Sequence, residues 1–133
     1  MHNKIMDRVL FVHEQEYDKR LVNQMDQLSV SVKRHTLEQL NDSGLIEVEV
    51  LVIVDPSIET LNRIVSLKYF GDNQVVIIAC KSPAKNLIAT AINLLHVTSI
   101  YDYSKSTDLA HVIENALIAL AKKSDMEVFL GES

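Results

Sequence analysis

Residues 50–55 read Val-Leu-Val-Ile-Val-Asp, a run of five aliphatic residues that ends at an acid. Valine and isoleucine favour β-strands, and a strand without alternating polar residues must be buried on both of its faces. Strands of this kind lie in parallel sheets that helices cover on both sides. Residues 50–54 are therefore predicted to form the central strand of a three-layer α/β domain, and Asp55 lies at its carboxyl end.

Strand and helix patterns alternate on both sides of this central strand. The segments with strand patterns are 8–12, 29–35, 47–54, 75–80 and 97–103. The segments that follow them, with the apolar spacing of helices, are 18–28, 36–44, 61–68, 82–95 and 109–123. Five such units with right-handed crossovers predict a flavodoxin-like (βα)5 three-layer sandwich, and the best-fitting order of its parallel strands is 2-1-3-4-5.

Local signals also predict where two helices begin and end. Ser82-Pro83 has the pattern of an N-cap followed by a first helical proline, so the fourth helix is predicted to start there. Lys122 and Lys123 suit the C-terminus of the last helix, since cations are favourable at that end. Residues 1–123 are thus predicted to form the domain, and 124–133 a tail or a linker toward a following domain.

Composition narrows the class of protein. The chain has 133 residues, of which 47% are hydrophobic and 23% charged, enough to bury the core of one domain. Its 13 Lys and Arg residues against 18 Asp and Glu residues give a net charge of −5, which opposes direct binding of nucleic acid. No apolar run approaches the roughly 18 residues that span a bilayer, so no membrane insertion is expected. A single cysteine and no secretory signal pattern predict a cytoplasmic location.

In folds of this class the functional site lies at the carboxyl ends of the strands. No glycine follows the first strand, so neither a dinucleotide fingerprint nor a flavin phosphate loop is present there. Cys80 stands alone, without the partner of a C-x-x-C redox pair, and the G-x-S-x-G motif of hydrolases is missing. These absences indicate that the domain is not an independent enzyme, although a small flavodoxin-like enzyme remains an alternative.

The strand ends do contain acids. Glu14 follows the first strand and Asp55 ends the third, so two carboxylates on neighbouring strands are predicted to hold a hard divalent cation such as Mg²⁺. This constellation, together with the length and the order of elements from Arg8 to about Lys122, resembles the receiver domain of bacterial response regulators.

The resemblance assigns roles to individual residues and also shows departures. Asp55 matches the aspartate that receives a phosphoryl group in the family. Glu14 matches the second acid of the metal-binding pair, whereas His13 stands where the first is expected. Ala79 stands where the family has a hydroxyl residue that hydrogen-bonds the phosphoryl group. Lys105 is the candidate for the family's invariant lysine, although an ungapped alignment puts Tyr103 at that position.

These departures weaken conventional switching. A charge-assisted hydrogen bond contributes about 1.5–3 kcal/mol, so a chain with Ala79 loses much of the response to a phosphoryl group on Asp55. His13 occupies the third position of the expected metal site, but a protonated imidazole would compete with Mg²⁺ for the carboxylates. The hypothesis is that protonated His13 forms an ion pair with Asp55 or Glu14. The resemblance therefore implies an atypical receiver domain, with a phosphorylation-independent pseudo-receiver, signalling by protein or small-ligand binding, as the alternative.

The resemblance also implies partners. A receiver domain of this kind would accept a signal from a histidine kinase or another signalling protein, and would dimerise through the surface formed by residues 83–123. Residues 129–133 (Phe-Leu-Gly-Glu-Ser) resemble the entry to the AAA+ ATPase domain of bacterial enhancer-binding transcription activators. This similarity predicts a C-terminal effector domain and a role in transcription control.

Overall fold

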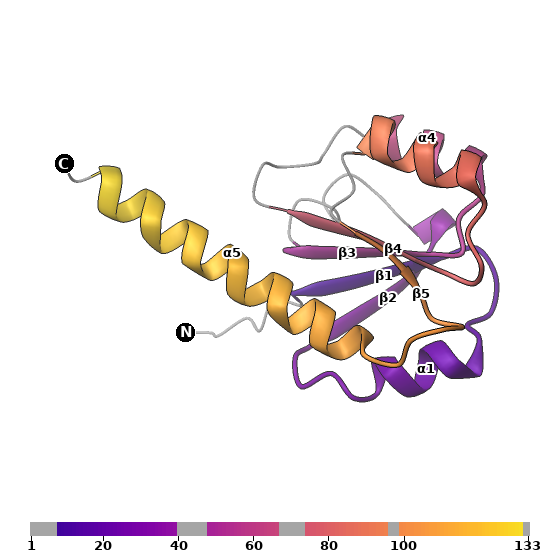
Figure 1. Cartoon of the computed structure of the whole chain (residues 1–133), viewed down its shortest axis with the longest axis horizontal. Helices are drawn as coiled ribbons and strands as arrows, with labels where there is room; N and C mark the ends of the chain where they lie inside the picture. Colours follow the sequence, from indigo (N-terminus) through magenta and orange to yellow (C-terminus); the bar gives the residue numbers. More distant parts are fainter. Residues whose placement is uncertain (1–7, 40–47, 67–73, 96–98, 132–133) are drawn as a thin grey trace.

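Five parallel strands form one sheet, in the order β2-β1-β3-β4-β5 (Figure 1). The computed structural model describes residues 8–39, 48–66, 74–95 and 99–131, and for Leu95 and residues 124–131 it describes the backbone alone. The strands are β1 (Val9–His13), β2 (Val32–Thr36), β3 (Val50–Val54), β4 (Val75–Cys80) and β5 (Ser99–Asp102). The flavodoxin-like strand order predicted from the sequence is therefore confirmed.

The strand that decides the fold occupies the centre of the sheet. All five residues of β3 are buried, as the unbroken aliphatic run predicts. In the register of the sheet, Val52 lies between Phe11 of β1 and Ile77 of β4. Because successive side chains point to opposite faces, the same strand supplies core residues to both sides of the sheet.

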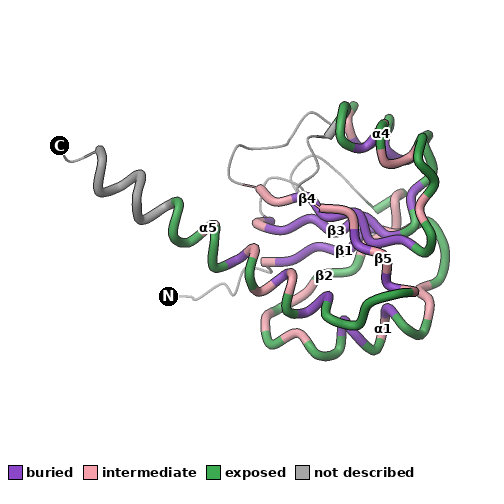
Figure 2. Tube along the Cα trace, in the orientation of Figure 1, coloured by how far each residue is buried: buried purple, intermediate pink, exposed green. Residues whose placement is uncertain are grey.

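Helices cover the two faces of the sheet in separate layers. They are α1 (Lys19–Met25), the 3₁₀ helix η1 (Leu37–Gln39), α3 (Ile58–Ser66), α4 (Lys85–Leu95) and α5 (Leu109–Gly131). Figure 1 shows α1 and α5 on one side of the sheet and α4 on the other. The buried residues of α1 and α5 share one hydrophobic core, and those of α3 and α4 share another. Figure 2 shows the buried strands between these partly exposed helical layers.

The start of α4 corrects one sequence prediction, and a second prediction lies partly outside the described residues. Ser82 has a φ angle of 50°, outside the helical region, and α4 begins only at Lys85. The amide of Ile88 donates to the carbonyl of Ala84, so the chain turns into the helix two residues later than the Ser-Pro signal indicates. In the predicted segment 36–44 the structure describes only η1, and residues 40–44 lie outside the described part of the chain.

The last helix is longer than predicted. It runs from Leu109 to Gly131, past the predicted end at Lys123. The physical reason is that neither glycine nor proline occurs between Leu109 and Leu130, so no residue interrupts the helical backbone at the two lysines. In Figure 1 the second half of α5 projects beyond the sheet. No helix in the described part of the chain is long and apolar enough to cross a membrane.

Candidate functional site

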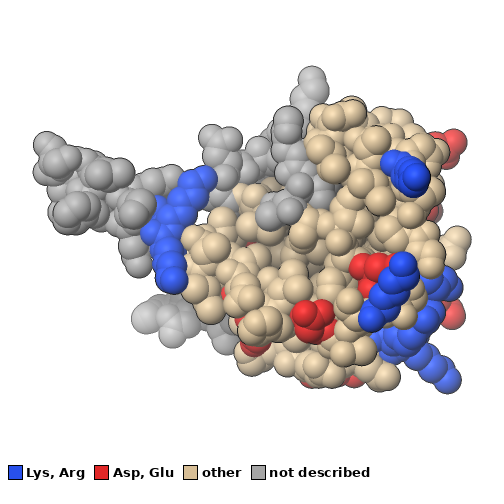
Figure 3. All heavy atoms as spheres, viewed as in Figure 1, with Lys and Arg blue, Asp and Glu red and all other residues tan. Residues whose placement is uncertain are grey.

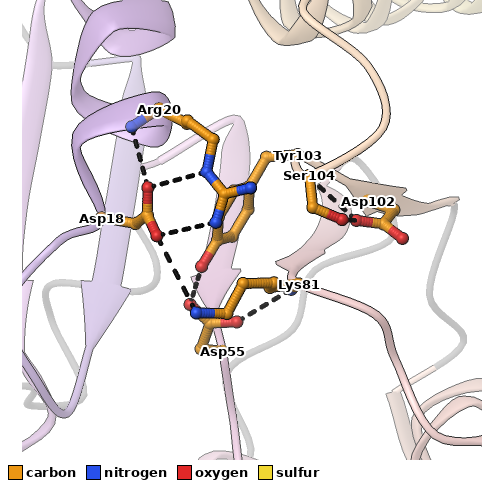
Figure 4. Close-up of polar contacts among 7 residues, drawn as sticks. All are labelled: Asp18, Arg20, Asp55, Lys81, Asp102, Tyr103 and Ser104. Atoms are coloured by element: carbon orange, nitrogen blue, oxygen red, sulfur yellow. Dashed lines mark hydrogen bonds and ion pairs between the residues drawn. The ribbon is translucent and has the colours of Figure 1, made fainter.

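Asp55 lies at the centre of the carboxyl edge of the sheet, where its side chain is held by two neighbouring segments (Figure 4). Its backbone has a φ angle of 44°, a left-handed conformation that aspartate tolerates better than most residues. The Asp55 amide donates to the Ala79 carbonyl at 2.8 Å, and Asp55 Oδ1 accepts the Lys81 amide at 3.0 Å. The Tyr103 hydroxyl donates to the other carboxylate oxygen, Oδ2. Both oxygens of Asp55 therefore accept hydrogen bonds from within the domain.

Tyr103 supplies the contact that links Asp55 to the segment after β5. Its side chain is only 2% exposed, and its amide donates to the Cys80 carbonyl at 3.1 Å, which fixes the residue beside β4. Burial raises the pKa of the Tyr103 phenol, and the hydrogen bond to Asp55 raises it further. The phenol thus stays protonated at physiological pH and acts as a neutral hydrogen-bond donor toward the carboxylate.

A second group of charged residues lies over the Tyr103 ring (Figure 4). Asp18 caps α1, and its carboxylate accepts the Arg20 amide at 2.9 Å and both Nε and Nη2 of Arg20 at 3.1 Å. The Arg20 guanidinium carbon lies 5.8 Å from the centre of the Tyr103 ring. Lys81 Nζ lies 3.9 Å from Asp18 Oδ2. Hydrogen bonds from Arg20 lower the pKa of Asp18 to about 2, so this carboxylate is charged at neutral pH.

The charges at this edge are partly compensated. In the view of Figure 3, a group of Lys and Arg side chains lies at the end of the molecule where the strands terminate, next to acidic side chains. Arg20 and Lys81 both face the Asp18 carboxylate, and about half of each side chain remains exposed. Ion pairs this exposed contribute about 0–1 kcal/mol, so their main role is to orient the side chains around Tyr103.

Glu14 and His13, the two residues predicted after the first strand, have other partners. The Glu14 carboxylate accepts the hydroxyl of Thr60, a buried residue in the first turn of α3. His13 Nδ1 is within hydrogen-bond distance of the Gln15 carbonyl, and its ring lies 4.0 Å from that of Tyr17. In the described contacts, His13 thus uses Nδ1 on the backbone, whereas the sequence hypothesis pairs it with a carboxylate.

The remaining predicted residues divide between the site and its surroundings. Ala79 is fully buried and its carbonyl accepts the Asp55 amide, so the structure brings these two residues together. Lys105 lies in the loop after β5, where its amide donates to the Asp102 carbonyl at 3.1 Å and its side chain is exposed. A hydrogen bond from Ser104 lowers the pKa of Asp102, and the charge of Lys105 adds a smaller effect. The described partner of the Lys105 charge is thus Asp102.

The two predicted magnesium ligands, Glu14 and Asp55, have protein hydrogen-bond partners in the structure. The described residues include no group of three or more His, Cys, Asp or Glu side chains that could hold a metal. Magnesium in proteins takes oxygen ligands in a near-octahedral shell. Glu14 and Asp55 would be the protein ligands, but their described hydrogen bonds go to separate protein donors. A cation at Asp55 would share the carboxylate with the Tyr103 hydroxyl and the Lys81 amide.

Sequence reasoning did not identify Asp18, Arg20 and Lys81. A signal for Asp18 was available, since an aspartate directly before a helical pattern is a common N-cap, and the cap lies at the carboxyl edge of the sheet. The ungapped alignment also placed Tyr103 at the family's lysine position. No pattern in the sequence indicates that Arg20 lies over Tyr103, because that contact joins segments more than 80 residues apart.

Comparison with solved structures supports the fold. The chain has 11% sequence identity and a TM-score of 0.58 to a putative pilus assembly-related protein from Burkholderia pseudomallei, covering 87% of this chain and 93% of that one. It has 15% identity and a TM-score of 0.56 to the signal receiver domain of an HD domain-containing protein from Pseudomonas fluorescens, covering 86% and 97%. For a response regulator receiver protein from Pseudoalteromonas atlantica the identity is 14% and the TM-score 0.56, with 84% and 98% covered.

No protein-family model and no curated protein sequence matches the chain. The structural likenesses, at identities this low, establish that the domain has the flavodoxin-like fold of receiver domains. They do not extend to the site, because one fold supports many functions. The function must therefore be argued from Asp55 and its neighbours.

Proposed function

We propose that this domain is a pseudo-receiver, a regulatory module with the receiver fold that signals without phosphorylation of Asp55. The observation that carries the proposal is the occupation of the Asp55 carboxylate. Tyr103 donates to Oδ2 and the Lys81 amide donates to Oδ1, so the carboxylate is already held by the hydrogen bonds of the folded domain. A phosphoryl group on Asp55 would therefore join a carboxylate whose two oxygens already accept hydrogen bonds from Tyr103 and the Lys81 amide.

The chemistry around Asp55 supports the same conclusion. Phosphoryl transfer relies on cations that neutralise the charge on the transferred group. At this site a neutral phenol faces Asp55, and the cations of Arg20 and Lys81 face Asp18. Ala79 offers no hydroxyl, and Glu14 binds Thr60. Among the described residues, the donors to the Asp55 carboxylate are therefore a neutral hydroxyl and a backbone amide, and no ion pair joins a cation to it.

We further propose that the domain acts in the cytoplasm as a homodimer that regulates a C-terminal effector. Two large apolar side chains are exposed within the predicted 83–123 surface, namely Ile92 of α4, which is 50% exposed, and Ile118 of α5, which is 53% exposed. Single exposed apolar side chains are common on protein surfaces, so these two serve as positions at which a dimer contact is tested. The similarity of residues 129–133 to the entry of AAA+ activators keeps transcription control as the predicted output.

Dimerisation is testable by sedimentation. Analytical ultracentrifugation of the domain is expected to show a dimer that Ile118→Glu dissociates, whereas Asn115→Glu, at an exposed position on the same helix, serves as a control for the added charge. A parent chain that stays monomeric at high concentration would contradict this part of the proposal.

A phosphotransfer assay tests whether Asp55 accepts a phosphoryl group. The domain is incubated with acetyl phosphate and millimolar Mg²⁺, next to an active receiver domain as positive control, and intact mass is recorded. The expected result is an unmodified mass. A single phosphoryl adduct that is absent from Asp55→Asn would overturn the proposal and establish Asp55 as a working phosphoacceptor.

A further inference from the structure

A buried glutamine joins α1 to the start of α5. Gln24 is 3% exposed, and its side chain makes three hydrogen bonds to the segment that leads from β5 into α5. Its Oε1 accepts the Leu109 amide at 2.9 Å and the Tyr101 hydroxyl at 2.8 Å. Its Nε2 donates to the Ser106 carbonyl at 3.1 Å. One residue of α1 thus contacts the end of the sheet, the loop and the first residue of the helix.

The contact to Leu109 replaces an ordinary helix cap. The first amides of a helix have no acceptor within it, and a side chain just before the helix usually supplies one. Here the acceptor comes from another helix, while the carboxylate of Asp108, the residue before α5, accepts the Tyr101 hydroxyl at 3.0 Å. The Tyr101 hydroxyl has one hydrogen and faces two acceptors, Gln24 Oε1 and Asp108 Oδ1. Burial and the Asp108 hydrogen bond raise the pKa of Tyr101 to about 12, so the hydroxyl is protonated at neutral pH.

The same helix also touches the Asp55 site. Arg20 lies one turn before Gln24 in α1, and residues four apart share one face of a helix. Arg20 contacts the Tyr103 ring, and Gln24 contacts Tyr101, two residues earlier in the chain. Tyr101 and Tyr103 belong to the hydrophobic core between the sheet and the α1–α5 layer. One face of α1 therefore contacts both Tyr103, which donates to Asp55, and Tyr101, which lies beside the start of α5.

We propose that Gln24 is a positioning residue that couples the Asp55 site to the first turn of α5 through α1. A change at Tyr103 shifts α1 or the 101–109 segment, and the Gln24 hydrogen bonds pass this shift to the Leu109 amide. Since α5 continues to Gly131, a small change in its first turn alters the direction of a long helix. This coupling holds whether or not Asp55 accepts a phosphoryl group.

Amide hydrogen exchange of residues 109–113 tests the positioning role. Gln24→Leu removes the three hydrogen bonds and keeps a side chain of similar size. It is expected to speed exchange in this turn by about tenfold relative to α3, because the Leu109 amide and the Ser106 carbonyl lose a buried partner. Gln27→Leu, an exposed glutamine three residues later, is the matched control and is expected to leave these rates unchanged.

A double-mutant cycle separates coupling from a merely structural role. Tyr103→Phe is expected to change exchange at 109–113 when Gln24 is present and to have no further effect in the Gln24→Leu background. Equal effects of Tyr103→Phe in both backgrounds would overturn the coupling. Equal exchange in Gln24→Leu and Gln27→Leu would overturn the positioning role. Neither result depends on phosphorylation, so a failure here is distinguishable from a failure of the pseudo-receiver proposal.

Discussion

The two faces of the sheet differ in chemistry. The hydrophobic residues between the sheet and α3 and α4 are aliphatic apart from Cys80, and α3 also buries Thr60. The opposite core, under α1 and α5, contains Tyr101 and Tyr103, and their hydroxyl groups contact Gln24, Asp108 and Asp55. Aliphatic contacts stabilise a fold without specifying one state, whereas hydrogen bonds between buried polar groups fix particular pairs of residues. We therefore expect the α3–α4 layer to contribute mainly stability, whereas the α1–α5 layer contains the hydrogen bonds on which the proposed signalling depends.

The largest effect is expected in the aliphatic layer. Ile78 of β4 is 1% exposed and packs in the α3–α4 core, so Ile78→Ala is expected to lower the free energy of unfolding by about 2–5 kcal/mol. Urea unfolding measures this loss. If this layer only stabilises the fold, amide shifts at Tyr103 and Leu109 stay unchanged under native conditions. Large shifts at those residues would contradict the claim that the α3–α4 layer only stabilises the fold.

A smaller effect is expected from a hydroxyl in the polar layer. Tyr103→Phe removes the hydrogen bond to Asp55 and is expected to cost about 1 kcal/mol of unfolding free energy, because water hydrates the exposed carboxylate in its place. Tyr17→Phe is the matched control, since the Tyr17 hydroxyl is buried and has no hydrogen-bond partner among the described residues. The control is expected to stay within about 0.5 kcal/mol of the parent chain. Equal losses in both variants would contradict the Tyr103 contact.

The tyrosines of the polar layer also predict an alkaline response. The pKa of Tyr101 is raised to about 12 in the folded domain, against about 10 for an unperturbed tyrosine. The unfolded chain thus loses this proton first, and the stability contributed by protonated Tyr101 is full below about pH 10 and falls as pH rises toward 12. Urea midpoints across this range are expected to fall less steeply in Tyr101→Phe. Identical slopes in both chains would show that Tyr101 titrates normally in the fold.

The smallest effect concerns the ion pair above Tyr103. Hydrogen bonds from Arg20 hold the pKa of Asp18 at about 2, below the value of about 3.9 for an unfolded chain. The stability from this pair is therefore present above about pH 4 and is lost as pH falls toward 2. In Arg20→Gln the Asp18 carboxyl is expected to titrate near its ordinary value, as measured by carbon-detected NMR. An Asp18 pKa that this substitution leaves unchanged would contradict the ion pair between Arg20 and Asp18.

Much of the fold was predictable because it depends on local patterns. The unbroken run 50–54 identifies a strand buried on both faces, and the alternation of strands and helices then limits the topology to a few choices. Helix ends were less predictable, since Ser82 resembles an N-cap but adopts a left-handed conformation. Likewise, Lys122 and Lys123 are typical of a helix C-terminus, but no glycine or proline follows them to end the helix before Gly131.

The site was predictable only in outline. Strand ends identify Asp55 and Ala79, because the carboxyl ends of parallel strands meet at one edge. The partners of Asp55 depend on which side chains reach it, and Tyr103 and Lys105 differ by only two residues along the same loop. Between β1 and α1, Glu14 turns toward Thr60 while Asp18 lies at the site, and no local pattern in the sequence distinguishes the two acids. Such choices depend on packing between distant segments, which single-sequence patterns do not contain.

The most direct test of the account is the amide NMR signal of Lys81 during titration with Mg²⁺ and then beryllofluoride, a mimic of the phosphoryl group. This amide donates to Asp55, so any ligand on the carboxylate must change its environment. The account predicts that the Lys81 and Tyr103 signals stay in place at millimolar Mg²⁺ with beryllofluoride. Shifts at both residues that disappear in Asp55→Asn would contradict it, and would mean that Asp55 is free to bind a phosphoryl group.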